Sequence, residues 1–178
     1  MEMKNVIAET FGAMIKEKDI DKITVKAVIE ACHISRQTFY YHFQDIMDLV
    51  EWSLSQAMQR MLARSLEAET PEKALCVMIS HFLESRELIR RLMSSQKRGQ
   101  IEKMIVQAAR AYLRELLCSK SPGVTLRYGN VEVMLDFWAC GVTGVLLQSC
   151  GQKDLDVQKL ANQLSRLIPA QITENFQA

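Results

Sequence analysis

Hydrogen-bonding side chains fill most of one short segment near the start of the chain: Ser35, Arg36, Gln37, Thr38, Tyr40, Tyr41 and His42. An arginine can donate two hydrogen bonds to guanine, a glutamine can pair with adenine, and a threonine can offer its methyl group to thymine. Tyrosine, histidine and threonine hydroxyl or ring groups are suited to phosphate oxygens. The chemistry available to this segment is therefore contact with base edges and with a phosphate backbone.

Two short helices around a tight turn are expected to position these side chains. Thr24 can cap a helix over residues 25–32, and Ser35 can cap a second helix over residues 36–43, because their hydroxyls can accept from an unpaired amide of the first turn. The apolar residues that would bury the inner faces recur at helical spacing: Val25, Val28, Ile29, Cys32, Ile34, Phe39 and Phe43. The polar residues of the second helix would then point outward.

Aromatic residues at helical spacing usually pack into a core, and the YYHF run of residues 40–43 taken alone would favour that interpretation. Its position directly after a capped turn, at the spacing of a known helix-turn-helix family, favours DNA binding instead. In helix-turn-helix proteins the second helix enters the major groove, while the first helix lies across the backbone. Arg36 and Gln37 would read bases, and Thr24 with Lys26 would lie near phosphates.

The segment resembles the helix-turn-helix of the TetR family of transcriptional regulators. Ile23-Thr24-Val25 and the run from Thr38 to Phe43 fill the family pattern, and residues 35–52 resemble more narrowly the regulators of dihydroxyacetone kinase operons. The resemblance implies an all-α fold, in which a three-helix head is joined by a long helix to a helical ligand-binding and dimerisation body. It implies a DNA-binding domain over residues 1–46 and a regulatory and dimerisation domain over residues 47–178.

Three positions depart from the family pattern. His33 replaces the glycine of the turn and must adopt a conformation that favours glycine by roughly 1 kcal/mol. Ile29 is larger than the small residue usual in the first helix, which could alter the spacing of the two helices. Ile46 replaces a lysine in the loop after the second helix, so a customary phosphate contact is missing.

Charge gives no independent support for nucleic-acid binding. Residues 1–50 contain six Lys and Arg against eight Asp and Glu, although DNA-binding domains usually carry a basic patch. Few phosphates can be neutralised by one subunit, so nonspecific affinity should be weak and its salt dependence shallow. Dimerisation would have to supply the remaining affinity.

Composition indicates a protein of the cytoplasm. The 178-residue chain has a net charge of +1 and five cysteines without a CxxC pair, which is typical of a reduced protein. The N-terminal residues lack the layout of a secretory signal, and we expect no apolar run long enough to cross a bilayer. Cys32, His33 and His42 lack metal-ligand spacing, so neither a metal nor another cofactor is expected.

Further amphipathic segments predict the rest of the helical fold. A first helix carries Ile7, Phe11, Met14 and Ile15, a long helix capped by Asp45 continues toward Glu67, and another begins after Thr70-Pro71. Polar or Pro/Gly breaks at residues 94–99 and 119–123 enclose the next helix. Two more are expected over residues 131–150 and from Leu155 to Ile168 or beyond.

Glycines three apart in the penultimate helix suggest close approach of another backbone. The pattern from Phe137 to Gly144 also resembles TetR-family bodies, in which the last two helices pair with a second subunit. The resemblance implies an interface that includes Phe137, Gly141, Gly144, Val145, Leu160 and Leu164. A homodimer would place two recognition helices about 34 to 36 Å apart on a near-palindromic operator.

An effector, a small molecule or a protein, is a further implication of the resemblance. Adaptable or aromatic side chains that could contact a small ligand are Met58, Met61, Met78, His81, Met104, Tyr112 and Trp138. Methionines are equally suited to filling a core, Trp138 could instead belong to the dimer seam, and periodicity does not locate pockets.

The motifs of the sequence bear on three classes of function. No phosphate-binding glycine loop or catalytic motif supports an enzyme. A regulator, usually a repressor in this family, with activation as the alternative, fits the head. A TetR-like protein that acts through a protein partner with weak DNA binding is a third possibility, which His33, Ile46 and the acidic head keep open.

Overall fold

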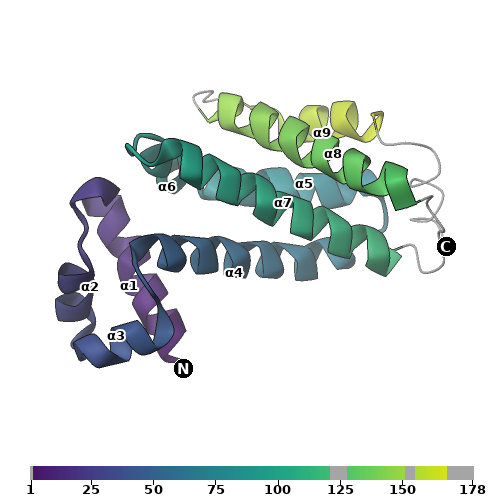
Figure 1. Ribbon diagram of the computed structural model, residues 1–178. Coiled ribbons are helices and arrows are strands. Elements are labelled where there is room, and N and C mark those ends of the chain that lie inside the picture. Colours follow the sequence, from purple (N-terminus) through teal and green to yellow (C-terminus); the bar gives the residue numbers. More distant parts are fainter. Residues whose placement is uncertain (1, 121–127, 151–154, 168–178) are drawn as a thin grey trace. The chain divides into compact units, whose positions relative to one another are not determined.

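A computed structural model describes residues 2–120, 128–150 and 155–167 of the chain (Figure 1). These residues form helices and contain no strand, so the prediction of an all-α fold is confirmed. The chain divides into two compact units. The N-terminal unit comprises Met1–Gln56 and Arg86–Met104, and the C-terminal unit comprises Ala57–Ser85 and Ile105–Ala178. Helices α4 (Ile46–Leu66) and α7 (Arg98–Lys120) each contribute to both units.

Three helices at the start of the chain form the predicted head: α1 (Met3–Glu17), α2 (Val25–Cys32) and α3 (Arg36–His42). A 3-10 turn, η1 (Ile20–Lys22), connects the first two. The core that joins these elements to the start of α4 is made of apolar side chains at most 5% exposed: Ile7, Phe11, Ile15, Ile20, Ile23, Val28, Phe39, Phe43, Met47, Leu49 and Val50. Burial of each large side chain contributes about 1.5 to 3 kcal/mol, so this core holds the head together.

Side-chain caps set the bounds of α2 and α3. The Thr24 hydroxyl accepts from the Ala27 amide at 3.2 Å, and the Ser35 hydroxyl accepts from the Thr38 amide at 2.9 Å. Between the helices, His33 adopts the left-handed conformation with φ 54° and ψ 39°. Both predicted caps and the strained turn at His33 are therefore confirmed, and α3 ends one residue earlier than expected.

A reciprocal pair of caps begins α4. The Asp45 carboxylate accepts from the amides of Met47 and Asp48 at 2.7 and 2.9 Å, and the Asp48 carboxylate accepts from the Gln44 amide at 2.7 Å. The predicted cap at Asp45 is confirmed, and this pair of carboxylates fixes the direction in which the chain leaves α3.

The N-terminal unit also includes α6 (Arg86–Met93) and the turn that follows it. Asp21 accepts from the Ser95 hydroxyl at 2.7 Å and from the Gln96 amide at 2.8 Å, and these bonds hold the pKa of the Asp21 carboxyl below its usual value. The Arg91 guanidinium donates to the Ile15 carbonyl at 3.4 Å. The helical head is thus tied to a segment about 75 residues away in sequence.

The prediction of one helix between Pro71 and Ser94 is wrong, because the structure contains two helices there. Helix α5 (Pro71–Glu84) begins at the predicted Thr70 cap and ends at Ser85, whose amide donates to the carbonyls of both His81 and Phe82. Helix α6 begins at the next residue, Arg86. No glycine or proline marks this break, so periodicity alone did not reveal it.

The C-terminal unit consists of α5, parts of α4 and α7, α8 (Tyr128–Ser149) and α9 (Val157–Ser165). Helix α9 packs along α5 (Figure 1). Glu132 of α8 accepts from both Arg110 and Arg114 of α7. Helix α8 begins three residues before the expected residue 131 and ends one residue before residue 150, and α9 begins two residues after the expected Leu155. Ile168, to which the last helix was expected to extend, lies outside the described residues.

The hydroxyls of Tyr112 and Ser65 form a buried hydrogen bond of 2.9 Å inside the C-terminal unit. Burial raises the pKa of Tyr112 to about 12, although the bond to Ser65 opposes this shift. Tyr112 therefore stays a neutral phenol at physiological pH.

Substitution of His33 tests the strained turn. We expect His33→Gly to be as stable as wild type or more stable by up to about 1 kcal/mol, because glycine adopts the left-handed conformation without steric cost. His33→Val should lose about 1 to 2 kcal/mol, because a β-branched residue is disfavoured at positive φ. Urea unfolding measures both values, and a valine variant as stable as wild type would contradict the strained turn.

Candidate nucleic-acid interface

The outer face of α3 presents the polar residues that the sequence singled out. Arg36, Gln37, Tyr40 and Tyr41 are exposed, with Tyr41 84% and Tyr40 48% exposed. Phe39, on the inner face, is fully buried. The aromatic residues of this segment therefore divide into a packed pair, Phe39 with Phe43, and an exposed pair of tyrosines.

Arg36 is held against the exposed tyrosine one turn later. Its guanidinium carbon lies 5.8 Å from the centroid of the Tyr40 ring, and the Tyr40 ring meets the buried Phe39 ring edge-on at 5.5 Å. The cation over the ring limits the freedom of a long side chain. Arg36 is thus partly organised for a contact outside the protein before any partner binds.

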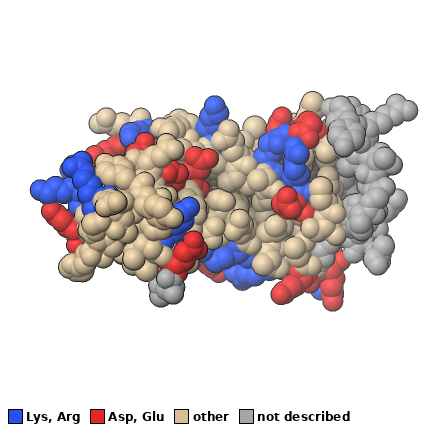
Figure 2. Space-filling model, turned by 60° about the horizontal axis from the view of Figure 1, so that its bottom comes forward, with Lys and Arg blue, Asp and Glu red and all other residues tan. Residues whose placement is uncertain are grey.

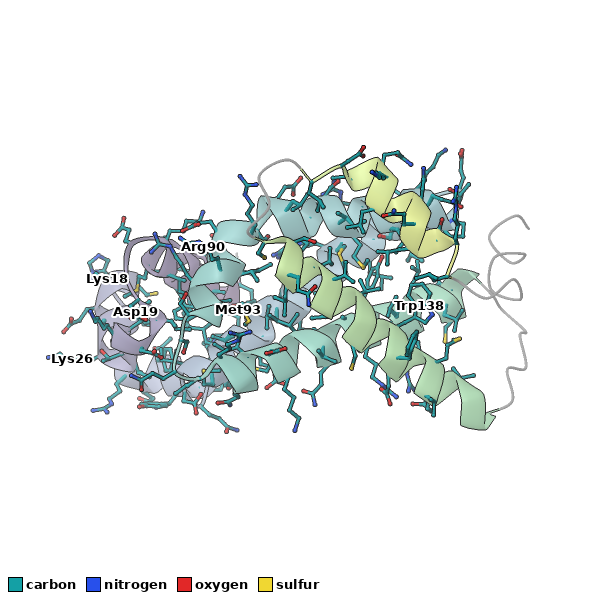
Figure 3. All side chains as sticks on the ribbon, turned by 90° about the horizontal axis from the view of Figure 1, so that it is seen from above. Lys18, Asp19, Lys26, Arg90, Met93 and Trp138 are labelled. Atoms are coloured by element: carbon teal, nitrogen blue, oxygen red, sulfur yellow. The ribbon has the colours of Figure 1, made fainter. Side chains whose placement is uncertain are left out.

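The remaining predicted contacts lie around the ends of α2 and α3. The Thr38 hydroxyl is 2.7 Å from the Ser35 hydroxyl, which leaves its methyl group for outside contacts. The half-buried His42 ring packs against the exposed Tyr41 ring at 5.0 Å. Lys26 extends outward from α2 (Figure 3), and its ammonium lies 3.8 Å from Glu30, both side chains being largely exposed. The nine predicted DNA-contacting residues, Thr24 and Lys26 included, all belong to α2, α3 or their caps.

Charge on the visible surface is mixed. Figure 2 shows Lys and Arg interspersed with Asp and Glu and no broad basic area on the face drawn. The acidic balance of residues 1–50 agrees with this distribution. Any binding of DNA by this head must therefore depend on a few well-placed contacts.

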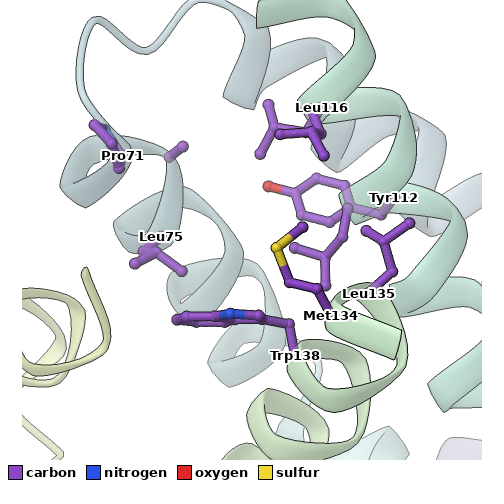
Figure 4. A pocket seen from close by; sticks show the side chains of 10 residues that line it. Pro71, Leu75, Tyr112, Leu116, Met134, Leu135 and Trp138 are labelled. Carbon is purple, nitrogen blue, oxygen red and sulfur yellow. The ribbon is translucent and has the colours of Figure 1, made fainter. Parts of the chain in front are cut away.

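A cavity of about 80 Å³ lies within the C-terminal unit (Figure 4). Pro71 and Leu75 of α5 face Tyr112 and Leu116 of α7 across it, and Trp138 of α8 lies along one side. Its other lining residues are likewise apolar: Ala74, Leu113, Leu117, Met134 and Leu135. Among the residues that the structure describes, no charged side chain lines this cavity.

Of the predicted ligand contacts, Tyr112 and Trp138 line this cavity and the other five do not. Met61 and Met78 are buried core residues, Met58 and His81 are half-buried, and Met104 belongs to the N-terminal unit. Burial lowers the pKa of His81, despite the nearby Glu84 carboxylate, which favours the neutral imidazole. Helical spacing does not distinguish core filler from cavity lining, so ligand contact by these five residues stays a prediction.

The outer face of α8 is the most apolar exposed surface among the described helices. Phe137 is 72% exposed, Val133 is 68% exposed, and Val145 is 36% exposed. A Cβ atom built at Gly141 or Gly144 would meet no described atom within 4 Å. Leu160 of α9 is half-buried and Leu164 is buried within the C-terminal unit, and their place in a dimer interface stays a prediction.

Residues 13–51 match the family model of the bacterial regulatory proteins of the tetR family. The matched segment contains α2, its turn, α3 and the start of α4, which carry the geometry described above. Residues 13–51 therefore carry the N-terminal sequence pattern of the TetR family. A comparison with curated protein sequences gives no match.

Solved structures of TetR-family type share the fold over nearly the whole chain. The dihydroxyacetone kinase operon activator DhaS aligns with 18% identity, 95% coverage of each chain and a TM-score of 0.62. The TetR family repressor AlkX from Dietzia sp. strain DQ12-45-1b has 15% identity, covers 99% of this chain and 98% of its own, and has a TM-score of 0.60. A transcriptional regulator from Aquifex aeolicus VF5 has 16% identity, coverage of 93% and 96%, and a TM-score of 0.55.

One helix corrects the expectation that no apolar run is long enough to cross a bilayer. Residues Val131–Ser149 of α8 are long and apolar enough to cross a bilayer by length and composition, with a mean hydropathy of 1.4. Core helices of soluble proteins pass the same test, and Leu135, Ala139, Val142 and Leu146 of this helix are buried in the C-terminal unit. Among the described residues, no group of three or more His, Cys, Asp or Glu could hold a metal ion.

The cavity predicts which ligands the C-terminal unit accepts. A small neutral aromatic such as toluene should shift the emission of Trp138 in a Trp52→Phe variant, whereas benzoate should not, because burying a charge without a partner is costly. The matched Trp138→Phe variant retains only Trp52, so its emission should not change. An equal response to benzoate, or a response only from Trp52, would contradict this prediction.

Proposed function

We propose that the protein is a homodimeric, ligand-responsive DNA-binding transcriptional regulator that acts on a near-palindromic operator in the cytoplasm. The observation that carries the proposal is the exposed face of α3, where Arg36, Gln37 and two tyrosines point outward from a helix whose inner face is fully packed. Two exposed tyrosines are suited to contacts with a partner, as is Arg36, which lies over the Tyr40 ring and has no carboxylate partner among the described residues.

The proposed docking follows from the chemistry of this face. Helix α3 enters the major groove, Arg36 pairs with guanine, Gln37 pairs with adenine, and Thr38 offers its methyl group to thymine. Tyr40, Tyr41, His42 and Ser35 contact phosphates, as do Lys26 and the amide end of α2 at Thr24. Base specificity then depends mainly on Arg36 and Gln37.

A second copy of the chain completes the proposed interface. The apolar face of α8, with Phe137, Val145 and the bare backbone at Gly141 and Gly144, supports pairing with the same face of a partner. Leu160 contributes from α9. Two heads of such a dimer would reach half-sites about one DNA turn apart.

The effector is proposed to bind the cavity of the C-terminal unit and to change the spacing of the two heads. No enzymatic activity and no cofactor form part of the proposal. The fold does not distinguish the sign of regulation, since the similar structures include an operon activator and a repressor. We favour repression, with activation as the alternative.

A second candidate function is action through a protein partner with only weak binding of DNA. The observation that favours it is the small basic surface of the head: Lys26 lies beside Glu30, and residue 46 is isoleucine. This candidate predicts that substitutions on α3 leave the activity of the protein in cells unchanged.

Fluorescence anisotropy with duplex DNA from upstream of the protein's own gene tests the proposal at two salt concentrations. Wild type should bind with dimer stoichiometry, and both Arg36→Ala and Tyr40→Ala should bind more weakly. Loss of one guanine contact per half-site should cost about 1 to 3 kcal/mol and reduce discrimination against a randomised duplex. No binding by wild type to either duplex would favour the protein-partner function.

Two matched aromatic substitutions separate dimerisation from DNA binding. We expect Phe137→Asp to give a monomer by light scattering, because a buried carboxylate would lack a partner across the α8 face. Tyr41→Asp alters an equally exposed aromatic on the head and should remain dimeric while its DNA affinity falls. A dimeric Phe137→Asp variant would exclude this face as the interface.

A further inference from the structure

The exit of the recognition helix lacks a cation in the local sequence. Residue 46 is a half-buried isoleucine, and the nearby charged residues, Asp45 and Asp48, are acidic and engaged in capping α4. A phosphate near this exit would therefore meet carboxylates and no positive charge from residues 43–48.

A lysine from a different helix occupies this neighbourhood. Lys4 lies in the first turn of α1, and its ammonium nitrogen is 5.7 Å from the centroid of the Phe43 ring and 6.0 Å from that of the Trp52 ring. Phe43 is the C-cap residue of α3, directly after His42, and the centroid of its ring lies 5.7 Å from that of the Trp52 ring. Figure 1 shows the N-terminal end of α1 beside the end of α3.

The Lys4 ammonium is held in place without being neutralised. The two aromatic rings attract it through their faces, whereas no carboxylate of the described residues lies within 4.0 Å of it. Lys26, by contrast, lies 3.8 Å from Glu30. Lys4 thus carries a full positive charge at a defined place beside the recognition helix.

We infer that Lys4 binds a DNA backbone phosphate at the exit of the recognition helix and supplies there the cation that residue 46 lacks. The inference depends on the proposed function, since it requires α3 to enter the major groove. Lys4 would contribute affinity and register and no base specificity, because a lysine at a phosphate carries no sequence information.

Salt dependence of binding tests this assignment in the full-length protein. Lys4→Met keeps an apolar stem over Phe43 and Trp52 and removes the charge. One lost phosphate contact per subunit should reduce the slope of log K against log salt by about 1.8 for the dimer, on both the upstream duplex and a randomised duplex. Lys16→Met is the matched control, because Lys16 lies on the same helix, about 18 Å along its axis.

Lys4→Arg keeps the charge and should retain the wild-type slope, which separates loss of charge from a general disturbance of the head. A Lys4→Met slope equal to that of wild type would overturn the assignment, as would a loss confined to the upstream duplex or an equal loss in Lys16→Met. If wild type binds neither duplex at low salt, the proposed function fails and this inference fails with it. If wild type binds and only the Lys4 result is negative, the proposed function stands.

Discussion

The direction of the recognition helix depends on a turn of three residues that holds one of them in an unfavourable conformation. His33 has φ 54°, a conformation that costs a non-glycine residue about 1 to 2 kcal/mol. The N-caps of α2 at Thr24 and of α3 at Ser35 each contribute about 1 kcal/mol. Burial of Val28, Phe39 and Phe43 contributes more. Packing and capping therefore outweigh the strain at His33. Because Phe39 is fixed inside, Arg36, Gln37, Tyr40 and Tyr41 are left outside.

The same inner face also determines where charge is placed. Phe43 ends α3 and lies against Trp52 of α4, and the two rings receive Lys4 from α1. A head with a slightly acidic balance can thus present a positive charge at the end of its recognition helix. The Asp21 contacts to Ser95 and Gln96 attach α6 and the following turn to the same unit. A change in the conformation of that turn would therefore alter the contacts of Asp21 in the head.

Local features of the head could be predicted from the sequence because their causes lie within a few residues. A hydroxyl before an apolar helical pattern identified both caps, and an unusual residue at the turn identified the positive φ. The break at Ser85 could not be predicted, since it has no glycine or proline and depends on the packing of α6 in a different unit from α5. Lys4 was not recognised as a site residue because its partners, Phe43 and Trp52, are distant in sequence.

In the C-terminal unit, side-chain chemistry alone selected Tyr112 and Trp138 among the cavity residues and missed the five leucines that form half of the lining. Leucines recur at the same helical spacing whether they face a core or a cavity, so only the packing of α5, α7 and α8 distinguishes the two cases. On α8, Phe137 is exposed, as an interface residue should be in a single chain. An exposed large apolar side chain suggests a partner, whereas a buried one only indicates a core. The interface on α8 stays a prediction.

Selection of DNA from a fully randomised duplex library by the wild-type protein tests the central claim most directly, since it assumes no operator. The account predicts enrichment of a near-palindromic sequence whose half-sites are about 10 base pairs apart, with a guanine in each half-site that is no longer selected by Arg36→Ala. Failure to enrich any sequence, or enrichment that Arg36→Ala leaves unchanged, would contradict the claim that α3 reads DNA.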